Sequence, residues 1–551
     1  MPYPMSSLPY QVHQGDTLAA DILAKLKTVD GATSGLDADL FEGKHLDQIS
    51  PDDLAEGLTK KIPSAAGQAD ANALGSNLYN ATLSTHLKTQ LPIDKALADA
   101  EVTQTLWDFT KAVKMPPNLL REMVESASAG AATVKHDDLG FPSMMYVVRG
   151  PILAGHIHAD MGATTALRTV AIAAAGSGYT ANDILTIAAG TGGTVRVLTV
   201  DGSGAVTSIQ IANPGSGYSA ATGAATTGGT GTGCTITTTI GPVHPAFLVN
   251  SVEKMEILIS MFKATSFNGT TFHGSGAGYR AVSWPGLIPT GSLDFDASKA
   301  IHTQKGAGWH MMTMWERALI MWLSMKMGTE PRGNTYYGRS HESGYEYECA
   351  VRSDGLAPGT ASGTAKHRNG SGPSKWSHNG ERWGIHDLVG SMYEWTDLFK
   401  IVDGLIKMPN DNNFALAEAS WPSQGVYFDN TTAGSGGAPR LNASLVNALT
   451  DLNYSAVTHN ALTMTAEYDT LDLAIRQRML AAGIAMKISS GGLNPWSPKG
   501  TLYMRNFGER MPGCGGSWDY TASAGLAYLY LLAFRTSVGH YVGSRSSFIS
   551  L

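Results

Sequence analysis

The chain has 551 residues, of which 15% are charged, 43% are hydrophobic and 63 are glycine. This composition predicts an ordered, loop-rich, β-leaning protein of about two to four domains and excludes a disordered one. The net charge of −7 and the lack of a basic run argue against nucleic acid as a partner. There is no run of about 18 apolar residues and no signal-peptide pattern, so we expect no membrane insertion and synthesis in a cytoplasm.

The first 140 residues are expected to form a helical attachment region. A helix is predicted after Asp16, and residues 51–130 look helical but have too little apolar mass for a large core. The pair Pro116-Pro117 predicts the start of a further helix. Residues 35–43 read GLDADLFEG, which resembles a segment that recurs in phage tail fibres; an Asp/Gly-rich turn is the alternative. Residues 1–140 therefore suit a stem that trimerises or attaches the chain to a virion.

Residues that favour β-strands begin near residue 141, and a strand is predicted over 145–149. The segment HIHAD at 156–160 alternates, so on a strand His156, His158 and Asp160 would share one face. In a trimer these histidines could surround a metal ion, and iron or nickel would suit them better than zinc. The alternative is a polar strand face or a set of interface histidines. No other cofactor is expected.

Residues 169–241 are expected to form a small β-rich insertion of Gly, Thr, Ala, Ser and Val. GSGY at 176–179 recurs at 215–218, and GTG at 190–192 recurs at 229–231. Between the copies, two β-prone runs flank the turn Asp201-Gly202 and predict a hairpin. The glycines have neither Walker nor Rossmann spacing, so they indicate turns and not a phosphate site.

After the insertion, a strand is expected over 252–259. A helix is predicted over 309–327, because Thr313 and Glu316 have capping-box spacing and Gly328 follows as a stop signal. A second helix is predicted over Thr470–Ala482, ended by Gly483.

Three blocks of sequence, in order, carry a family resemblance. The first runs from Trp309 to Gly328, and the second, at 383–397, reads WGIHDLVGSMYEWTD. The third runs from GGSW at 515–518 to GSR at 543–545. Together they resemble the formylglycine-generating-enzyme branch of the C-type-lectin fold. The resemblance implies an α+β, C-type-lectin-like domain over residues 141–551 that contains the insertion.

Most residues of these blocks are expected to be structural. Large tryptophans anchor a domain that is poor in long helices, glycines allow the backbone to approach closely, and one arginine ties the third block into the domain. These residues are Trp383, Trp395, Trp518, Gly390, Gly515, Gly516 and Arg545.

An enzyme is not expected. The three cysteines, Cys234, Cys349 and Cys514, are far apart and form neither a disulfide framework nor a metal knuckle. Oxidases of the resembled branch hold copper through paired cysteines near the third block, where this chain has only Cys514, and one thiol cannot supply a two-thiolate site. A formylglycine-generating-type oxidase is the alternative. Glu394 and Asp397 could suggest glycoside hydrolysis, but the resemblance gives Glu394 a structural role.

The segment after GGSW resembles the variable proteins of diversity-generating retroelements, of the major tropism determinant type. In that family, mutable adenines in asparagine codons do not yield Lys, Glu, Gln, Met or Trp, and none of these occurs from Asp519 to Tyr541. The segment is rich in tyrosine, which gives large, rigid contact area at low entropy cost. The resemblance places a ligand-binding, variable face at Asp519, Tyr520, Ser523, Tyr528, Tyr530, Leu532, Ala533, Phe534, Arg535, Ser537, Gly539, His540 and Tyr541.

Residues between these positions, namely Leu526, Leu529 and Leu531, are expected to be buried anchors. The alternative interpretation is a buried, Leu/Tyr-rich pair of strands without a binding role.

The sequence thus predicts a bacteriophage tail-fibre protein that binds a bacterial cell-surface receptor, either a protein or a glycan. The expected assembly is a homotrimer in the virion, made in the host cytoplasm and attached to other tail or baseplate proteins. A purely structural virion protein is a further alternative.

Overall fold

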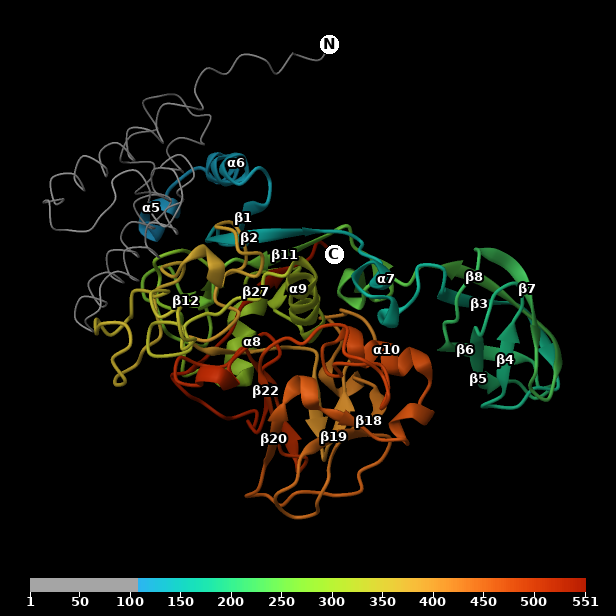
Figure 1. The fold of residues 1–551 in the computed structure, drawn as a ribbon. Helices are drawn as coiled ribbons and strands as arrows, with labels where there is room; N and C mark the ends of the chain where they lie inside the picture. Colours follow the sequence, from blue (N-terminus) through green and yellow to red (C-terminus); the bar gives the residue numbers. More distant parts are fainter. Residues whose placement is uncertain (1–107) are drawn as a thin grey trace, which may run out of the picture.

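The computed structural model describes residues 108–551. The helix expected after Asp16 and the GLDADLFEG segment at 35–43 lie outside the described residues. Within them the protein is β-rich with few helices, and the insertion forms a separate β lobe beside the main body (Figure 1). No helix in the described part of the chain is both long and apolar enough to cross a membrane.

A five-stranded antiparallel sheet joins distant parts of the sequence. In spatial order its strands are β1 (Ala132–His136), β2 (Pro142–Arg149), β11 (Glu256–Ser260), β27 (Ser546–Phe548) and β14 (Trp309–Met311). The strand predicted over 145–149 is confirmed as part of β2. Because β1 precedes residue 141, this sheet includes residues of the expected attachment region, and the division at residue 140 stays a prediction.

Two helices precede the sheet, α5 (Phe109–Ala112) and α6 (Pro117–Ala127). The helix predicted from the double proline is confirmed, because a proline in the first turn gives up only an N–H that a helix start leaves unpaired. On α6, Leu120 and Val124 are buried in an apolar cluster that also contains Phe109. This cluster joins the helices to the sheet.

The central helix, α9 (Met314–Met327), confirms the predicted capping box. The Thr313 hydroxyl accepts a hydrogen bond from the Glu316 N–H at 3.2 Å, and the Glu316 carboxylate accepts one from the Thr313 N–H at 2.9 Å. Gly328 ends the helix with a left-handed φ of 71°. The predicted start at residue 309 is wrong, because Trp309–Met311 forms β14 and pairs with β27. Strand pairing overrides helix propensity there.

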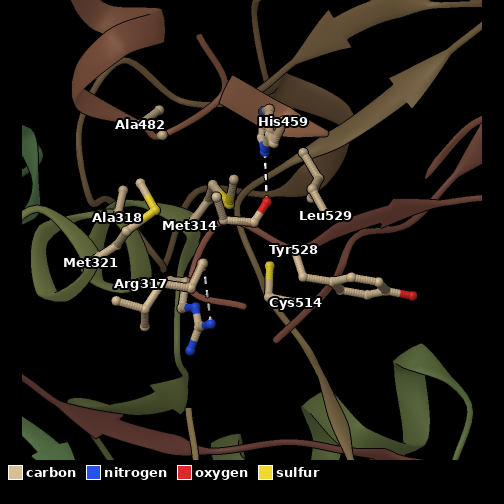
Figure 2. A pocket seen from close by; sticks show the side chains of 12 residues that line it. Met314, Arg317, Ala318, Met321, His459, Ala482, Cys514, Tyr528 and Leu529 are labelled. Carbon is tan, nitrogen blue, oxygen red and sulfur yellow. Dashed lines mark hydrogen bonds between the residues drawn. The ribbon is translucent and has the colours of Figure 1, made fainter. Parts of the chain in front are cut away.

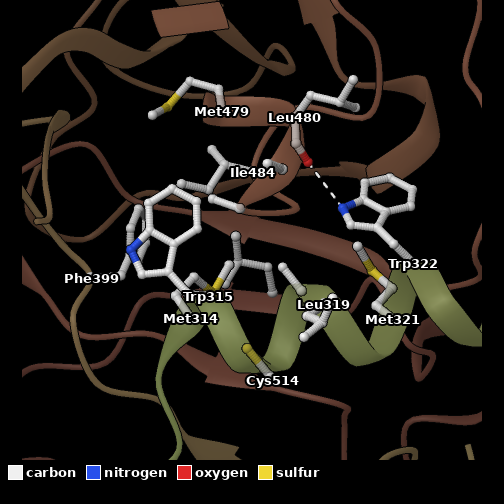
Figure 3. Close-up of a cluster of buried hydrophobic side chains, with 14 of the residues drawn as sticks. Met314, Trp315, Leu319, Met321, Trp322, Phe399, Met479, Leu480, Ile484 and Cys514 are labelled. Carbon is white, nitrogen blue, oxygen red and sulfur yellow. Dashed lines mark hydrogen bonds between the residues drawn. The ribbon is translucent and has the colours of Figure 1, made fainter. Parts of the chain in front are cut away.

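The main hydrophobic core surrounds α9. Trp315 and Trp322 are fully buried, and the Trp322 indole donates a hydrogen bond to the Leu480 carbonyl at 3.0 Å (Figure 3). Leu480 belongs to α10 (Leu473–Ala481), so this bond joins the two helices. The helix predicted over 470–482 is therefore confirmed with shorter bounds.

The insertion builds its own six-stranded sheet and its own apolar core. In spatial order the strands are β3 (Leu167–Ser177), β8 (Thr232–Ile240), β7 (Ala221–Thr227), β4 (Ile184–Ile187), β5 (Thr194–Val200) and β6 (Val206–Asn213). The hairpin predicted around Asp201-Gly202 is confirmed as β5 and β6.

The repeats in the insertion pack against each other across the two copies. Tyr179 and Tyr218, which end the two GSGY motifs, are both buried. A Cβ on Gly190 would lie 2.3 Å from the Tyr218 ring, and one on Gly231 would lie 2.6 Å from the Tyr179 ring. Each tyrosine therefore lies over a GTG glycine of the other copy, so the two copies complete one core together.

Two predicted strands differ from the structure. The HIHAD segment is not a strand: Ala154–Ile157 forms the helical turn α7 and Ala159–Met161 a 3-10 turn, so the histidines do not share a strand face. The buried pair here is Ala154 and Ile157, whose spacing of three suits a helical turn. The strand predicted over 252–259 is split into β10 (Val252–Glu253) and β11.

The remaining body contains one helix, two small sheets and two larger ones. The helix is α8 (Phe295–Thr303), and the small sheets pair β9 (Leu248–Val249) with β10 and β12 (Thr265–Phe267) with β13 (Arg280–Val282). One six-stranded sheet has the order β21 (Thr463–Met464), β19 (Pro439–Asn442), β18 (Ser423–Asn430), β17 (Leu405–Lys407), β16 (Lys400–Val402) and β23 (Glu509–Arg510). The other carries the candidate site.

Candidate functional site

The candidate site lies on a six-stranded sheet to which the second and third sequence blocks contribute three strands. In spatial order the strands are β20 (Ser455–Thr458), β22 (Thr501–Met504), β25 (Leu529–Leu531), β24 (Gly513–Cys514), β15 (Tyr393–Trp395) and β26 (Val542–Gly543). Tyr503, Tyr530 and Gly513 stand in register across β22, β25 and β24. Since side chains alternate along a strand, these three residues share one face of the sheet.

Seven tyrosines gather around this face, and we call them the tyrosine face. They are Tyr393, Tyr454, Tyr503, Tyr520, Tyr528, Tyr530 and Tyr541, and neighbouring ring centroids lie 5.4 to 6.5 Å apart. Tyr393 and Tyr528 are buried, whereas Tyr454 is 52% and Tyr541 37% exposed. The cluster therefore runs from the interior to the surface.

Gly513 makes the arrangement possible. A Cβ at this position would lie 2.6 Å from the Tyr393 ring, so any larger residue at position 513 would displace that ring. Tyr393 in turn contacts both Tyr530, at 5.4 Å, and Tyr541, at 5.5 Å between ring centroids. One glycine thus allows the central ring to connect the two ends of the face.

Burial keeps the hydroxyls of Tyr393, Tyr520, Tyr528 and Tyr530 protonated at neutral pH. Burial raises the pKa of Tyr520 to about 12, and burial also raises the pKa values of Tyr393, Tyr528 and Tyr530. These four side chains are consequently uncharged, with apolar rings and polar tips, which suits contact recognition more than acid–base chemistry.

The structure divides the sequence-predicted positions by exposure. Asp519, Phe534, His540 and Tyr541 are exposed, and Tyr520, Ser523, Tyr530, Leu532, Arg535, Ser537 and Gly539 are half-buried. Tyr528 and Ala533 are buried, because both belong to the apolar cluster under the face, so they support neighbours and do not offer contact surface. The expected anchors Leu526, Leu529 and Leu531 are confirmed as buried.

The loop between β25 and β26 is held down by Arg535. Its guanidinium forms ion pairs with Asp296 at 2.6 Å, with Glu509 at 3.4 Å and with Glu418. An arginine shared by three carboxylates is fixed in place, so it positions the loop and is not free for a ligand. Beside it, Phe534 is 48% exposed and covers another arginine, Arg510, whose guanidinium carbon lies 3.9 Å from the ring centroid.

A buried ion network lies beneath the site and ties the blocks together. Glu394 accepts hydrogen bonds from Lys263 at 2.7 Å and from Arg545 at 2.8 Å, and all three side chains are buried. Arg545 also donates to the carbonyls of Ser260 at 2.8 Å and His386 at 2.7 Å. The expected role of Arg545 as a tie is confirmed, and Glu394 is engaged as its counterion.

The backbone joins the same blocks. The Met312 N–H donates to the Arg545 carbonyl at 2.8 Å, and the Met314 N–H donates to the Asp397 carbonyl at 2.9 Å. Gly390 and Gly515 are also bonded, at 3.1 Å, and a Cβ on Gly390 would lie 2.0 Å from a backbone oxygen. All three blocks therefore meet at one place under the sheet, with the glycines in the close approach that was predicted for them.

Cys514 lies on the inner side of the same sheet. Its side chain is buried beside a small cavity of about 10 Å³, which Arg317 and His459 also line (Figure 2). Burial raises the pKa of the Cys514 thiol. Cys234 and Cys349 are likewise buried, and none of the three cysteines forms a disulfide. Among residues 108–551 no group of three or more His, Cys, Asp and Glu side chains is placed to hold a metal ion.

Sequence reasoning missed Tyr393, Tyr454 and Tyr503. Tyr393 stands in the second block, and Tyr503 alternates with the buried residues Leu502 and Met504 on β22. That alternation was the available signal, but it does not reveal which strands lie side by side. Only the parallel pairing of β22 with β25 brings Tyr503 to Tyr530.

No family profile matches the chain. None of the curated proteins matches it either. Among solved structures it is similar to the Major Tropism Determinant I1 Variant, with 12% identity over 68% of this chain and 72% of that chain and a TM-score of 0.20. A TM-score this low does not establish a shared fold.

Proposed function

We propose that this protein is a bacteriophage receptor-binding protein that adheres to a host cell-surface ligand through the tyrosine face and the exposed residues around it. The observation that carries the proposal is the gathering of Tyr520, Tyr530 and Tyr541, all from the predicted variable segment, into one aromatic cluster. Tyrosine is enriched where proteins bind proteins and glycans, because it offers much contact area with few rotatable bonds.

The finer parts of the proposal rest on the sequence blocks. We propose that the scaffold is C-type-lectin-like and that a retroelement diversifies selected positions between Asp519 and Tyr541. The meeting of the three blocks around Glu394 and Arg545 supports a fixed frame, and the exposure of Asp519, Phe534 and His540 supports a variable surface. A homotrimer in the phage tail would multiply weak single-site binding.

We further propose that adhesion involves no catalysis. Cys514 is buried and has a raised pKa, which is the opposite of an activated nucleophile. Glu394 is occupied by two cations, so it is unsuited to act as a general acid.

The test compares two tyrosines of equal exposure. Tyr541, in the tyrosine face, and Tyr345, outside it, are each 37% exposed. We expect Tyr541→Ala to reduce adsorption of the protein to host cells at least tenfold, because truncating an aromatic side chain that dominates an interface costs about 2 kcal/mol or more. Tyr345→Ala should leave adsorption unchanged. Equal adsorption by all variants would contradict the proposal and favour a purely structural virion protein.

A further inference from the structure

A groove lies between the insertion and the main body, and none of its lining residues belongs to the tyrosine face. It is lined by β3 and β6 of the insertion and by α10 of the body, and α10 lies beside β6 (Figure 1). Its volume is about 470 Å³, within the range of about 300–1,000 Å³ that small-molecule sites occupy. Junctions between domains are a preferred location for such sites.

Two arginines line this groove, Arg168, which is paired with Glu253, and Arg478. One guanidinium nitrogen of Arg478 donates to the side-chain oxygens of Asn410, at 2.8 Å, and Gln424, at 2.6 Å. Both acceptors are neutral amides. Gln424 is itself buried and anchored by a hydrogen bond to the Met408 carbonyl at 2.7 Å. The guanidinium is therefore oriented by dipoles while its charge stays without a counterion.

The acids near the groove are already engaged. Asp472 pairs with Arg196 at 2.8 Å, and Glu253 pairs with Arg168. Asp411 accepts a hydrogen bond from the backbone of Ser251 at 2.7 Å. Within residues 108–551, no carboxylate lies within ion-pair distance of Arg478. A cation that is partly withdrawn from water and lacks an anion has a desolvation cost that no ion pair offsets.

Burial also affects how Arg478 titrates. It lowers the pKa of Arg478 to about 10, so the side chain remains charged at neutral pH. The guanidinium of Arg478 is thus desolvated without a compensating negative charge from the protein, and an anionic ligand would supply that charge.

The rest of the groove suits a sugar ring. Gln210 of the insertion and Gln477 of α10 line it with amides that both donate and accept hydrogen bonds, as hydroxyl groups require. Val170 and Ile209 supply an apolar wall for the ring faces. Polar groups from both sides would then converge on one ligand.

We propose that this groove binds an anionic saccharide, with the charged group of the sugar at Arg478 and its hydroxyls at Gln210 and Gln477. A guanidinium accepts carboxylate and phosphate alike, so both charged forms belong to the same chemical class. The site is independent of adhesion through the tyrosine face.

The test uses the full chain and three probes: glucuronate, glucose 6-phosphate and glucose. Binding is measured by ligand-observed NMR titration at low salt. We expect the two anionic probes to bind and glucose to bind at least tenfold more weakly, and the stronger of the two identifies carboxylate or phosphate as the preferred group. Arg478→Met should weaken anion binding at least tenfold. Arg476→Met, on the same helix but outside the groove lining, should not.

A second variant covers the case in which Arg478→Met does not fold. Gln210→Ala lies in the insertion, away from the contacts that Arg478 makes in the body, and should weaken both anionic probes several-fold. Equal binding of glucose and glucuronate would overturn the proposal. So would anion binding that survives Arg478→Met or, where that variant does not fold, Gln210→Ala. Cell adsorption is not part of this test, so its result stands apart from that of the tyrosine face.

Discussion

Replacing Glu394 with glutamine tests the buried ion network most directly. Glu394 is the only anion that contacts both Lys263 and Arg545 among the described residues, and the three side chains are at most 1% exposed. Glu394→Gln keeps the shape of the side chain but leaves two buried cations without a counterion. Removing one partner from a buried ion pair typically costs about 3–5 kcal/mol, because the remaining charge stays desolvated.

The contacts of Glu394 predict how much stability each variant of the network loses. Arg545→Met should cost less than Glu394→Gln, because Lys263 still neutralises the carboxylate at 2.7 Å. We expect Glu394→Gln to lower the free energy of unfolding by about 4 kcal/mol, measured by urea titration with the fluorescence of the chain's 11 tryptophans. The control is Glu342→Gln, which removes the more exposed pair with Lys499 and should cost under about 1 kcal/mol. Similar losses for both variants would refute the reasoning.

The same carboxylate has a defined pH dependence. Burial alone would raise the pKa of Glu394, but the positive charges of Arg545 and Lys263 lower it to about 2. Its folded pKa thus lies below the ordinary value of 4.5, so its contribution to stability is complete above pH 4.5 and is lost as the pH falls toward 2. The decline should be smaller in Glu394→Gln, and an identical decline would contradict this assignment.

Three further outcomes are expected. Arg510→Met should raise the free energy of unfolding by about 1 kcal/mol, seen as a higher urea midpoint, since the buried guanidinium has no hydrogen-bond partner in the described structure. A lower urea midpoint would argue that the contact of Arg510 with Phe534 matters more. Gly513→Ala should destabilise the protein and weaken adsorption, because the added Cβ meets the Tyr393 ring at 2.6 Å, whereas Gly491→Ala, which meets nothing within 4 Å, should do neither. The three buried thiols should resist a thiol reagent until the protein is unfolded, and rapid labelling of the native protein would disprove their burial.

Local signals in the sequence predicted local structure well. The capping box at Thr313 and Glu316, the double proline before α6 and the Asp201-Gly202 turn each act through neighbouring backbone groups, and all three are present. Alternation over five residues at HIHAD was too short to distinguish a strand from a helical turn. The structure has a helical turn there, which buries Ala154 and Ile157 together.

Only part of the candidate site could be predicted from the sequence. The tyrosine content of 519–541 pointed to this segment, but Tyr454 and Tyr503 reach it through the pairing of β20 with β22 and of β22 with β25. Such pairings depend on the global topology. The sequence also could not separate Tyr530, which is half-buried, from Tyr528, which is buried two residues earlier.

The position of β27 constrains how the chain can be made. This strand lies between β11 and β14, both of which leave the ribosome long before it. The nascent chain cannot close the five-stranded sheet until residue 548 has been synthesised, so a premature stop codon within 519–541 would leave an open sheet edge and an unfilled place beside the core. Every molecule with a closed five-stranded sheet has therefore been translated through the whole candidate segment.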